Sequence, residues 1–265
     1  MAMTSEPIRF TDGAGYDRFM GVWSRLVGKE FLDWIAPNEG QRWLDVGCGN
    51  GAFTQLIAEQ NKPLALVGID PSEAQLAYAR QHPLLQSVDF VNADAMDLPF
   101  PDEAFDLAVM PLVIFFVPEP VQGVAEMARV VAPGGTVAAY AWDMEGGGFP
   151  YQSVNETLGA VGKAIPLPPS VSSSRLEALS DLWVTAGLGD IYTRVITVER
   201  TYTDFDDLWN TVLGGPSAGQ ALAAMSEEEH TRFRELLQAR LQPSGSGSIS
   251  LTGRAHAIRG TVPSL

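Results

Sequence analysis

The chain has few of the residues that several classes of protein require. It contains one cysteine among 265 residues, so it cannot form an internal disulfide, and we expect a reducing, cytoplasmic setting. No apolar run approaches the roughly 20 residues that a membrane-spanning helix needs. The first ten residues also lack the basic-then-apolar pattern of a secretory signal. We therefore expect a protein that acts without a membrane.

Basic residues are scarce as well. There are 17 Lys and Arg against 32 Asp and Glu, which gives a formal net charge of −15. A protein that holds nucleic acid needs a basic surface to displace the counterions of the phosphates. The sequence contains no cluster of Lys and Arg that would supply one. We therefore expect no nucleic-acid substrate.

The most informative segment is an apolar strand that runs directly into a glycine loop. The strand Trp43-Leu44-Asp45-Val46 is followed by Gly47-Cys48-Gly49-Asn50-Gly51, and a helical pattern of apolar residues begins at Phe53. Glycines at this point let the backbone turn sharply and approach a ligand where a Cβ would clash. The start of the next helix offers free N–H groups. The segment therefore predicts a nucleotide-type cofactor loop.

Two cofactor classes fit this loop when it is taken alone. Gly47-x-Gly49-x-x-Ala52 matches the loose dinucleotide fingerprint, and an acid, Asp70, ends the next strand at about the right distance, so an NAD(P)-dependent oxidoreductase is one alternative. Asp45 argues against it, because a dinucleotide-binding strand is usually uncharged at that position. Further acids and glycines recur downstream in a fixed order.

These downstream motifs resemble a known family. The motifs are Val67-Gly68-Ile69-Asp70, Asn92-Ala93-Asp94-Ala95-Met96, Phe105-Asp106-Leu107-Ala108-Val109-Met110 and Ala132-Pro133-Gly134-Gly135. Together with the glycine loop they resemble the class I S-adenosylmethionine (SAM)-dependent methyltransferases, specifically the type 11 small-molecule branch. The resemblance covers roughly residues 40–142. It implies transfer of a methyl group from SAM to a small organic acceptor, with release of S-adenosylhomocysteine.

Strand and helix patterns alternate from Arg42 to Trp142, which indicates an α/β protein with a parallel sheet covered on both faces. The resemblance implies a Rossmann-like sheet of seven strands, the last antiparallel and placed between strands 5 and 6. We expect one domain over 1–265. Its core would comprise about 36–142, 172–200 and 248–262, and its mobile lid about 10–30, 143–171 and 201–247.

Local signals mark where several helices begin. Ser72, Ser174 and Ser226 each precede a Gln or Glu by three residues, the spacing of a capping box, and Asp204 is a further candidate cap. Residues 190–200 and the alternating segment that begins at Ile249 read as strands. These signals divide the second half of the chain into elements.

The resemblance also implies which residues hold SAM. Asp70, with Pro71 beside it, would accept the ribose hydroxyls in charge-assisted bonds. A role as helix cap is its alternative. Asp45 and the loop backbone would surround the methionyl tail, and a buried acid satisfied by loop N–H groups is the alternative there. The remaining candidates are Gly47, Cys48, Gly49 and Gly51 in the loop, Asp94, Ala95 and Met96 at the adenine, and Met110 and Pro111 at the tail's amine.

Two of these candidates carry specific alternatives. Cys48 is conceivable as a catalytic thiol, although small loop residues usually serve through their backbone. For Asp94 there are two alternatives: Asp97 could contact the adenine in its place, or Asp94 could serve only as a turn residue.

The N-terminal segment has a strong helical stripe of apolar residues. One interpretation is a helix packed on the sheet or over the site. The other is that Tyr16 lines the methyl pocket and Arg25 pairs with the cofactor carboxylate. The stripe consists of Tyr16, Phe19, Met20, Trp23, Leu26 and Val27.

The acceptor side is the least defined. No metal-ligand pattern and no general base can be identified, because His82, His230 and His256 read as surface or sheet residues. Aromatic residues of the expected lid fit either an apolar acceptor or lid core. They are Phe115, Phe116, Trp142, Phe149, Tyr151 and Trp209. A SAM-binding protein without catalysis is therefore a further alternative.

Overall fold

The computed structural model describes residues 17–163, 165–215, 218–241 and 247–264. Tyr16 lies outside the described residues, so its predicted place in the methyl pocket stays a prediction. No helix in the described ranges is both long and apolar enough to cross a membrane.

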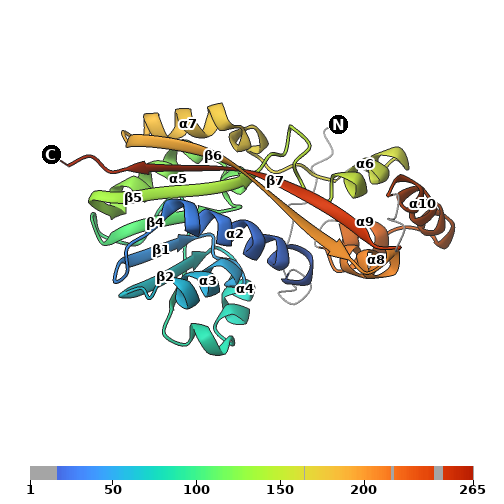
Figure 1. The fold of residues 1–265 in the computed structure, drawn as a ribbon, viewed down its shortest axis with the longest axis horizontal. Helices are drawn as coiled ribbons and strands as arrows, with labels where there is room; N and C mark the ends of the chain where they lie inside the picture. Colours follow the sequence, from blue (N-terminus) through green and yellow to red (C-terminus); the bar gives the residue numbers. More distant parts are fainter. Residues whose placement is uncertain (1–16, 164, 216–217, 242–246, 265) are drawn as a thin grey trace.

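Seven strands form one sheet in the order β3-β2-β1-β4-β5-β7-β6 (Figure 1). The first five in this order pair in parallel, whereas β7 runs antiparallel to both β5 and β6. The predicted fold class and the predicted place of the last strand are therefore confirmed. The strands are β1 (Arg42–Val46), β2 (Ala65–Asp70), β3 (Asp89–Asn92), β4 (Phe105–Pro111), β5 (Val131–Trp142), β6 (Gly189–Tyr202) and β7 (Ile249–Thr261).

Helices cover both faces of this sheet. Helices α2, α3 and α4 lie on one face, and α5 and α7 lie on the other (Figure 1). Their bounds are α2 (Val22–Ile35), α3 (Ala52–Gln60), α4 (Glu73–Ala79), α5 (Pro120–Val130) and α7 (Leu176–Thr185). Short helical turns η1 (Asp17–Gly21), η2 (Pro83–Leu85), η3 (Ile114–Phe116) and η4 (Val171–Ser174) join them.

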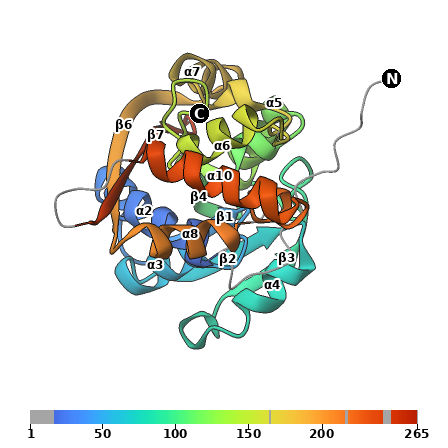
Figure 2. The same ribbon diagram turned by 90° about the vertical axis from the view of Figure 1, so that its right-hand side faces the viewer.

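Strands β6 and β7 extend well beyond the other strands. Between them the described residues form the helices α8, α9 and α10, which gather with α6 at one end of the molecule (Figures 1 and 2). These helices are α6 (Gln152–Ala160), α8 (Phe205–Leu213), α9 (Ala218–Ala223) and α10 (Glu227–Arg240). Their shared core includes the buried side chains of Trp209 and Phe233.

Most of the predicted helix starts are confirmed. The Ser226 and Glu229 pair forms a full capping box, and the Ser72 and Asp204 side chains each accept an N–H of the first turn. The prediction for Ser174 is wrong. Its hydroxyl donates to the Val171 carbonyl at 2.7 Å inside η4, and α7 begins only after Arg175. A serine that bonds to its own preceding turn is not free to cap the next helix.

The N-terminal stripe packs as a helix against the sheet. Phe19, Met20, Trp23 and Val27 are buried, as predicted, but Leu26 is 36% exposed. The segment begins with the π-helical turn η1, and after it the buried positions recur in pairs at 23/24, 27/28 and 31/32. Because the stripe follows that spacing, position 26 falls at its edge.

A buried group of hydroxyl and indole groups joins this helix to the lid segments. The hydroxyl of Tyr151, at the start of α6, accepts from Trp23 Nε1 at 3.1 Å and donates to the Phe19 carbonyl at 2.8 Å. It also lies 3.0 Å from the Tyr202 hydroxyl at the end of β6. Lid mobility stays a prediction, but these bonds require the three segments to move together.

We predict that Tyr151→Phe lowers the free energy of unfolding by about 1–3 kcal/mol, because it leaves a buried N–H and a buried carbonyl without their partner. Urea unfolding measures the change. Tyr78→Phe is the matched control, since that side chain is 37% exposed, and we expect it to stay within about 0.5 kcal/mol. Equal effects of the two substitutions would contradict the role given to Tyr151.

Candidate functional site

The glycine loop connects β1 to α3 at the carboxyl edge of the sheet. Its glycines have φ values of +73° at Gly47, +54° at Gly49 and +85° at Gly51, which side chains rarely adopt. A Cβ at Gly47 would lie 2.5 Å from Val113, and one at Gly51 would lie 2.7 Å from Leu85. A Cβ at Gly49 would meet nothing within 4 Å. Gly49 is therefore the glycine that faces open space.

Asp45 lies in β1 directly below this loop and is completely buried. Its Oδ2 accepts the hydroxyl of Thr54 at 2.7 Å, whereas its Oδ1 has no hydrogen-bond partner among the described residues. Burial raises the pKa of Asp45 to about 7, and the nearby Asp70 adds to the shift against the opposing Thr54 bond. A buried oxygen without a partner fits a site that binds a cationic group.

Thr54 is a site residue that the sequence analysis missed. It is fully buried in the first turn of α3 and holds one oxygen of Asp45. A polar residue between the apolar Phe53 and Leu56 was the available signal, because a buried hydroxyl on a core-facing turn needs a partner.

Asp70 ends β2 and connects two loops. Its Oδ2 accepts the N–H of Gly49 at 3.0 Å, and its Oδ1 accepts the N–H of Ser72 at 2.8 Å. Burial raises its pKa, although both of these bonds oppose the shift. The helix-cap alternative is thus partly right, because Asp70 supports the turn that Ser72 caps. Each carboxylate oxygen still has a lone pair for a ligand hydroxyl.

The structure gives Cys48 a backbone role. Its N–H donates to the Ile69 carbonyl at 2.8 Å, and its side chain is buried. Burial raises the pKa of the thiol well above its usual range, and the charges of Asp45 and Asp70 raise it further. A nucleophilic cysteine needs a lowered pKa, so the thiol interpretation finds no support here.

The turn after β3 contains the predicted adenine residues. Asp94 is exposed, and its Oδ1 accepts the N–H of Met96 at 2.8 Å. Ala95 and Met96 are partly buried, and the Met96 carbonyl accepts from the Gln122 side chain at 2.8 Å. Asp97, the competing acid, donates its N–H to the Asp94 carbonyl. Asp94 therefore does serve as a turn residue, and its side chain is still exposed.

The end of β4 contributes a strained residue that the sequence did not indicate. Met110 and Pro111 end the strand, as predicted, and both are buried. Leu112 follows with a φ of +60°. Its N–H donates to the Tyr140 carbonyl at 2.7 Å. A bulky residue in this region of φ is uncommon and tends to occur at functional sites. It turns the chain so that Val113 packs against Gly47.

Arg25 does not contact this loop in the structure. Its Nη1 lies 2.9 Å from Asp17 Oδ1, in a half-exposed ion pair within the N-terminal segment. Its predicted pairing with the cofactor carboxylate therefore stays a prediction.

None of the three histidines is arranged as a general base. His256 Nδ1 lies 2.8 Å from the Ser174 carbonyl, and its Nε2 lies 3.6 Å from Asp143, so the ring is held between a carbonyl and a carboxylate at the β7 side of the sheet. His230 packs against the ring of Trp209, and His82 accepts an N–H in the turn after α4. In the described part of the chain, no group of three His, Cys, Asp or Glu is placed to hold a metal ion.

The lid aromatics are mainly core. Phe116 and Phe149 are partly buried, whereas the other four have at most 4% of their surface exposed. Those four are Phe115, Trp142, Tyr151 and Trp209. Of the two interpretations left open by the sequence, the packing role is therefore the one that these contacts support for most of the set.

Comparison with known proteins places this geometry in a family. Residues 44–139 match a family described as a methyltransferase domain. The demethylmenaquinone methyltransferase of Listeria monocytogenes serotype 4a is 35% identical over 131 residues, which cover 46% of this chain and 55% of that protein. The chain spans 24% to 56% of the length of the curated relatives that it matches.

Solved structures show the same fold. A protein of Bacillus halodurans described as a putative methyltransferase has a TM-score of 0.59 at 17% identity, over 89% of this chain and 99% of that one. Phosphoethanolamine N-methyltransferase 2 of Haemonchus contortus, in complex with SAM, has a TM-score of 0.59 at 17% identity, over 96% and 58%.

The motifs, the strand order and these comparisons agree. The predicted resemblance is confirmed over residues 44–139, which match the methyltransferase-domain family, and the strand order is that of solved structures with the same fold.

Proposed function

We propose that this protein transfers the methyl group of SAM to an O, N or C atom of a small organic acceptor and releases S-adenosylhomocysteine. The single observation that carries the proposal is the unpartnered, fully buried Oδ1 of Asp45 beneath the open space at Gly49. An isolated carboxylate oxygen costs free energy when buried, unless a ligand supplies a partner. The cationic amine of a methionyl tail would supply one.

The surrounding residues fit the rest of the same cofactor. Asp70 would accept the ribose hydroxyls at the end of β2, with Pro71 beside it, while Asp94, Ala95 and Met96 would hold the adenine at the end of β3. The backbones of Gly47, Cys48 and Gly51, with Met110 and Pro111 at the end of β4, would enclose the tail. These segments follow neighbouring strands of one sheet, so their carboxyl ends meet at one edge.

Bound SAM would supply a methyl group on a sulfonium, which is a good leaving group. The protein then has to position the acceptor and exclude water, and these two effects carry much of the barrier for such displacements. An acceptor amine, thiol or carbon needs no general base, which agrees with the engaged histidines. The buried contacts among Phe19, Trp23 and Tyr151 would help to keep the site dry.

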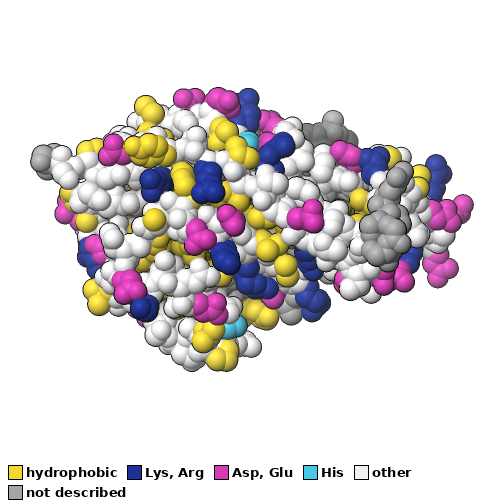
Figure 3. Space-filling view, viewed as in Figure 1, with side chains coloured by type: hydrophobic (Ala, Val, Ile, Leu, Met, Phe, Trp, Pro, Cys, Tyr) yellow, Lys and Arg dark blue, Asp and Glu magenta, His cyan; other side chains and the backbone are white. Residues whose placement is uncertain are grey.

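A small acceptor is favoured over nucleic acid. The relative from Listeria is named for a small molecule, demethylmenaquinone, and is 35% identical to this chain over 131 residues. On the face seen in Figure 3, Lys and Arg are interspersed with Asp and Glu, and the formal net charge of the chain is −15. On this face no continuous basic patch is seen that could replace the counterions of a phosphate backbone.

The alternative is a protein that binds SAM or S-adenosylhomocysteine without turnover. Calorimetry with SAM, S-adenosylhomocysteine and NAD tests the cofactor class, and we expect binding of the first two only. Incubation with methyl-labelled SAM and small-molecule extract tests transfer. Label in a new small product supports the proposal, whereas tight SAM binding with no transfer across broad extracts would favour the non-catalytic alternative. Binding of NAD alone would overturn both.

We predict that Gly49→Val abolishes SAM binding while Gly40→Val leaves it unchanged. Both glycines have positive φ, and both have nothing within 4 Å of an added Cβ, so the two substitutions strain the backbone alike. Only the Gly49 side chain would enter the space proposed for the cofactor tail. Titration calorimetry measures binding, and thermal unfolding checks that the two variants fold equally. A folded Gly49→Val protein with wild-type affinity would place the cofactor elsewhere.

We predict that SAM binding near pH 6 releases protons and that this release fades toward pH 8. Asp45 holds its proton in the free protein up to a pKa of about 7, and a cationic ligand favours the ionised carboxylate. Calorimetry in buffers of different ionisation enthalpy measures the release.

Asp45→Asn should remove the proton release together with much of the affinity. The raised pKa of Asp45 also affects the stability of the free protein. As the pH rises from about 4 to about 7, the carboxyl ionises in the unfolded chain before it does in the folded protein, so the free energy of unfolding falls over this range. Binding heats that do not depend on the buffer at pH 6 would show that Asp45 keeps its protonation state.

A further inference from the structure

The hydroxyl of Thr54 makes a different hydrogen bond from those of several other helical threonines in this chain. Thr157, Thr211 and Thr231 each donate to the carbonyl four residues earlier in the same helix. Threonines inside helices commonly form that bond. Thr54, in the first turn of α3, instead donates to Asp45 Oδ2 on β1 at 2.7 Å. Its hydroxyl therefore serves a carboxyl outside its own helix.

The other groups around Asp45 do not favour its charge. Its cross-strand neighbours are Gly68 on β2 and Val109 on β4, and neither of them is charged. Burial raises the pKa of Asp45, and the negative Asp70 at the end of β2 raises it further. The bond from Thr54 is the interaction in the described chain that opposes this shift. It therefore favours the ionised carboxylate.

The titratable and charged groups of the neighbouring elements supply no cation to Asp45. Burial raises the pKa of the Cys48 thiol in the glycine loop, so that group stays uncharged. Arg25 on α2 pairs with an acid of η1, Arg80 after α4 pairs with an acid of α4, and Arg42 on β1 pairs with an acid of β4. Within the described ranges, no cation acts on Asp45.

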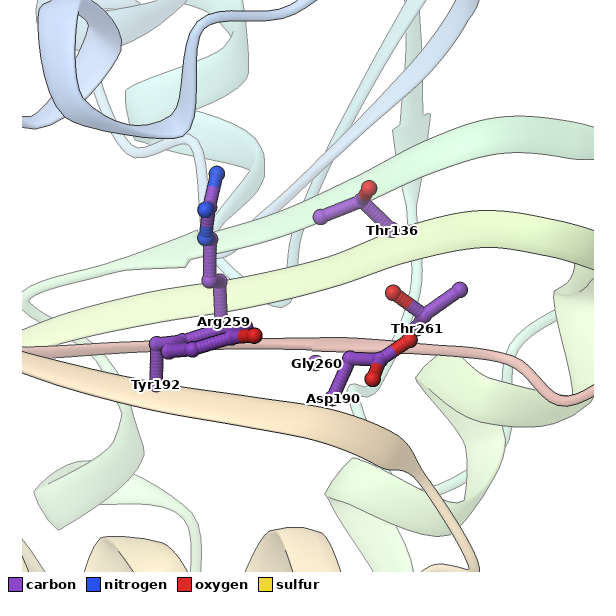
Figure 4. Close-up of a pocket in the computed structure, with 6 residues that line it drawn as sticks. All are labelled: Thr136, Asp190, Tyr192, Arg259, Gly260 and Thr261. Carbon is purple, nitrogen blue, oxygen red and sulfur yellow. The ribbon is translucent and has the colours of Figure 1, made fainter.

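The unpartnered oxygen of Asp45 is not explained by the open cavity shown in Figure 4. That cavity, of about 370 Å³, is lined by residues of β5, β6 and β7, among them Tyr192 and Arg259. Strand β4 lies between β1 and β5, so the cavity and Asp45 belong to separate parts of the sheet. The open space nearest to Asp45 in the chain is the one at Gly49, in the loop that directly follows β1.

We propose that Thr54 is a positioning residue of the cofactor site, whose hydroxyl holds Oδ2 of the ionised Asp45 and leaves Oδ1 for the amine of the ligand. This inference rests on the proposed function. With Oδ2 occupied, Oδ1 is the oxygen that can accept from a cationic amine, directly or through a water. Thr54 is fully buried behind Asp45, so it acts through that carboxylate and not on the ligand itself.

Removal of this hydroxyl should raise the pH at which Asp45 ionises. Thr54→Val keeps the shape of the side chain and leaves both oxygens of the carboxyl without a protein partner, which favours the neutral form. We expect the midpoint of the Asp45 titration to rise from about 7 by at least about one pH unit. Thr54→Ser retains the hydroxyl, and its midpoint should stay close to that of the wild type.

NMR of the free, full-length protein measures this titration through carbon-13 in the aspartate carboxyl groups. The signal that disappears in Asp45→Asn identifies Asp45. Thr157→Val is the matched control, because Thr157 is also buried in a helix, while its hydroxyl bonds only to its own helix at 2.6 Å. We expect that control to leave the titration of Asp45 unchanged.

Calorimetry with S-adenosylhomocysteine then tests the effect on binding from about pH 6 to about pH 9. Below pH 7 the dissociation constant of Thr54→Val should exceed that of the wild type at least about tenfold, because a smaller fraction of Asp45 is ionised. The ratio of the two constants should fall toward one as the pH approaches 9. The ionisation of the ligand itself cancels in this ratio, since it is common to both proteins.

The outcomes separate this inference from the proposed function. An unchanged Asp45 titration in Thr54→Val would overturn the inference. So would a loss of affinity that is the same at every pH, because a merely structural role of Thr54 predicts it. Thr54→Ser behaving like Thr54→Val would also contradict the role of the hydroxyl. In each of these cases the wild type still binds, so the proposed function stands. A wild type that binds no S-adenosylhomocysteine at any pH would overturn both.

Discussion

The bridge that Asp70 makes between two loops is the constraint on which the site depends. One carboxylate accepts an N–H from the glycine loop after β1 and an N–H from the turn after β2. These bonds fix the ends of two neighbouring strands relative to each other before any ligand is present. They also hold the carboxylate at the end of β2, beside the glycine loop. A site assembled in this way costs little reorganisation when a ligand arrives.

Asp45 adds a buried carboxyl group beneath these two loops. The protein buries a carboxyl completely and satisfies one oxygen through Thr54. The cost appears as the raised pKa of Asp45, and its chief cause is loss of hydration. A bound cation would repay that cost locally. Burial, and after it the charges of Asp45 and Asp70, raise the pKa of the Cys48 thiol well above its usual range, so this thiol is not activated for nucleophilic attack.

The sequence predicted the glycine loop and the strands around it well, because its signals there are local. Glycines that need positive φ, acids at strand ends and alternating strand patterns all act within a few residues of themselves. Part of what it missed depends on contacts that a local pattern does not show. Leu112 has a φ of +60° and donates its N–H to the distant Tyr140 carbonyl, whereas Ser174 fails as a cap because its hydroxyl donates to Val171, three residues before it. Tyr151, which joins three segments, gave no pattern of its own.

The acceptor side is obscure in the sequence for the same physical reason. An aromatic residue in a lid has two ways to lower its free energy, by packing in the protein or by contacting a ligand, and both favour the same residue types. Here Trp142 and Tyr151 are buried by α2 and the long β6–β7 pair, so their composition reports the packing of the lid. The glycine loop differs, because its positive φ values require glycine, and side-chain packing does not select glycine in the same way. A glycine loop of this kind therefore reveals the class of ligand that it fits more readily than buried aromatic residues reveal the identity of an acceptor.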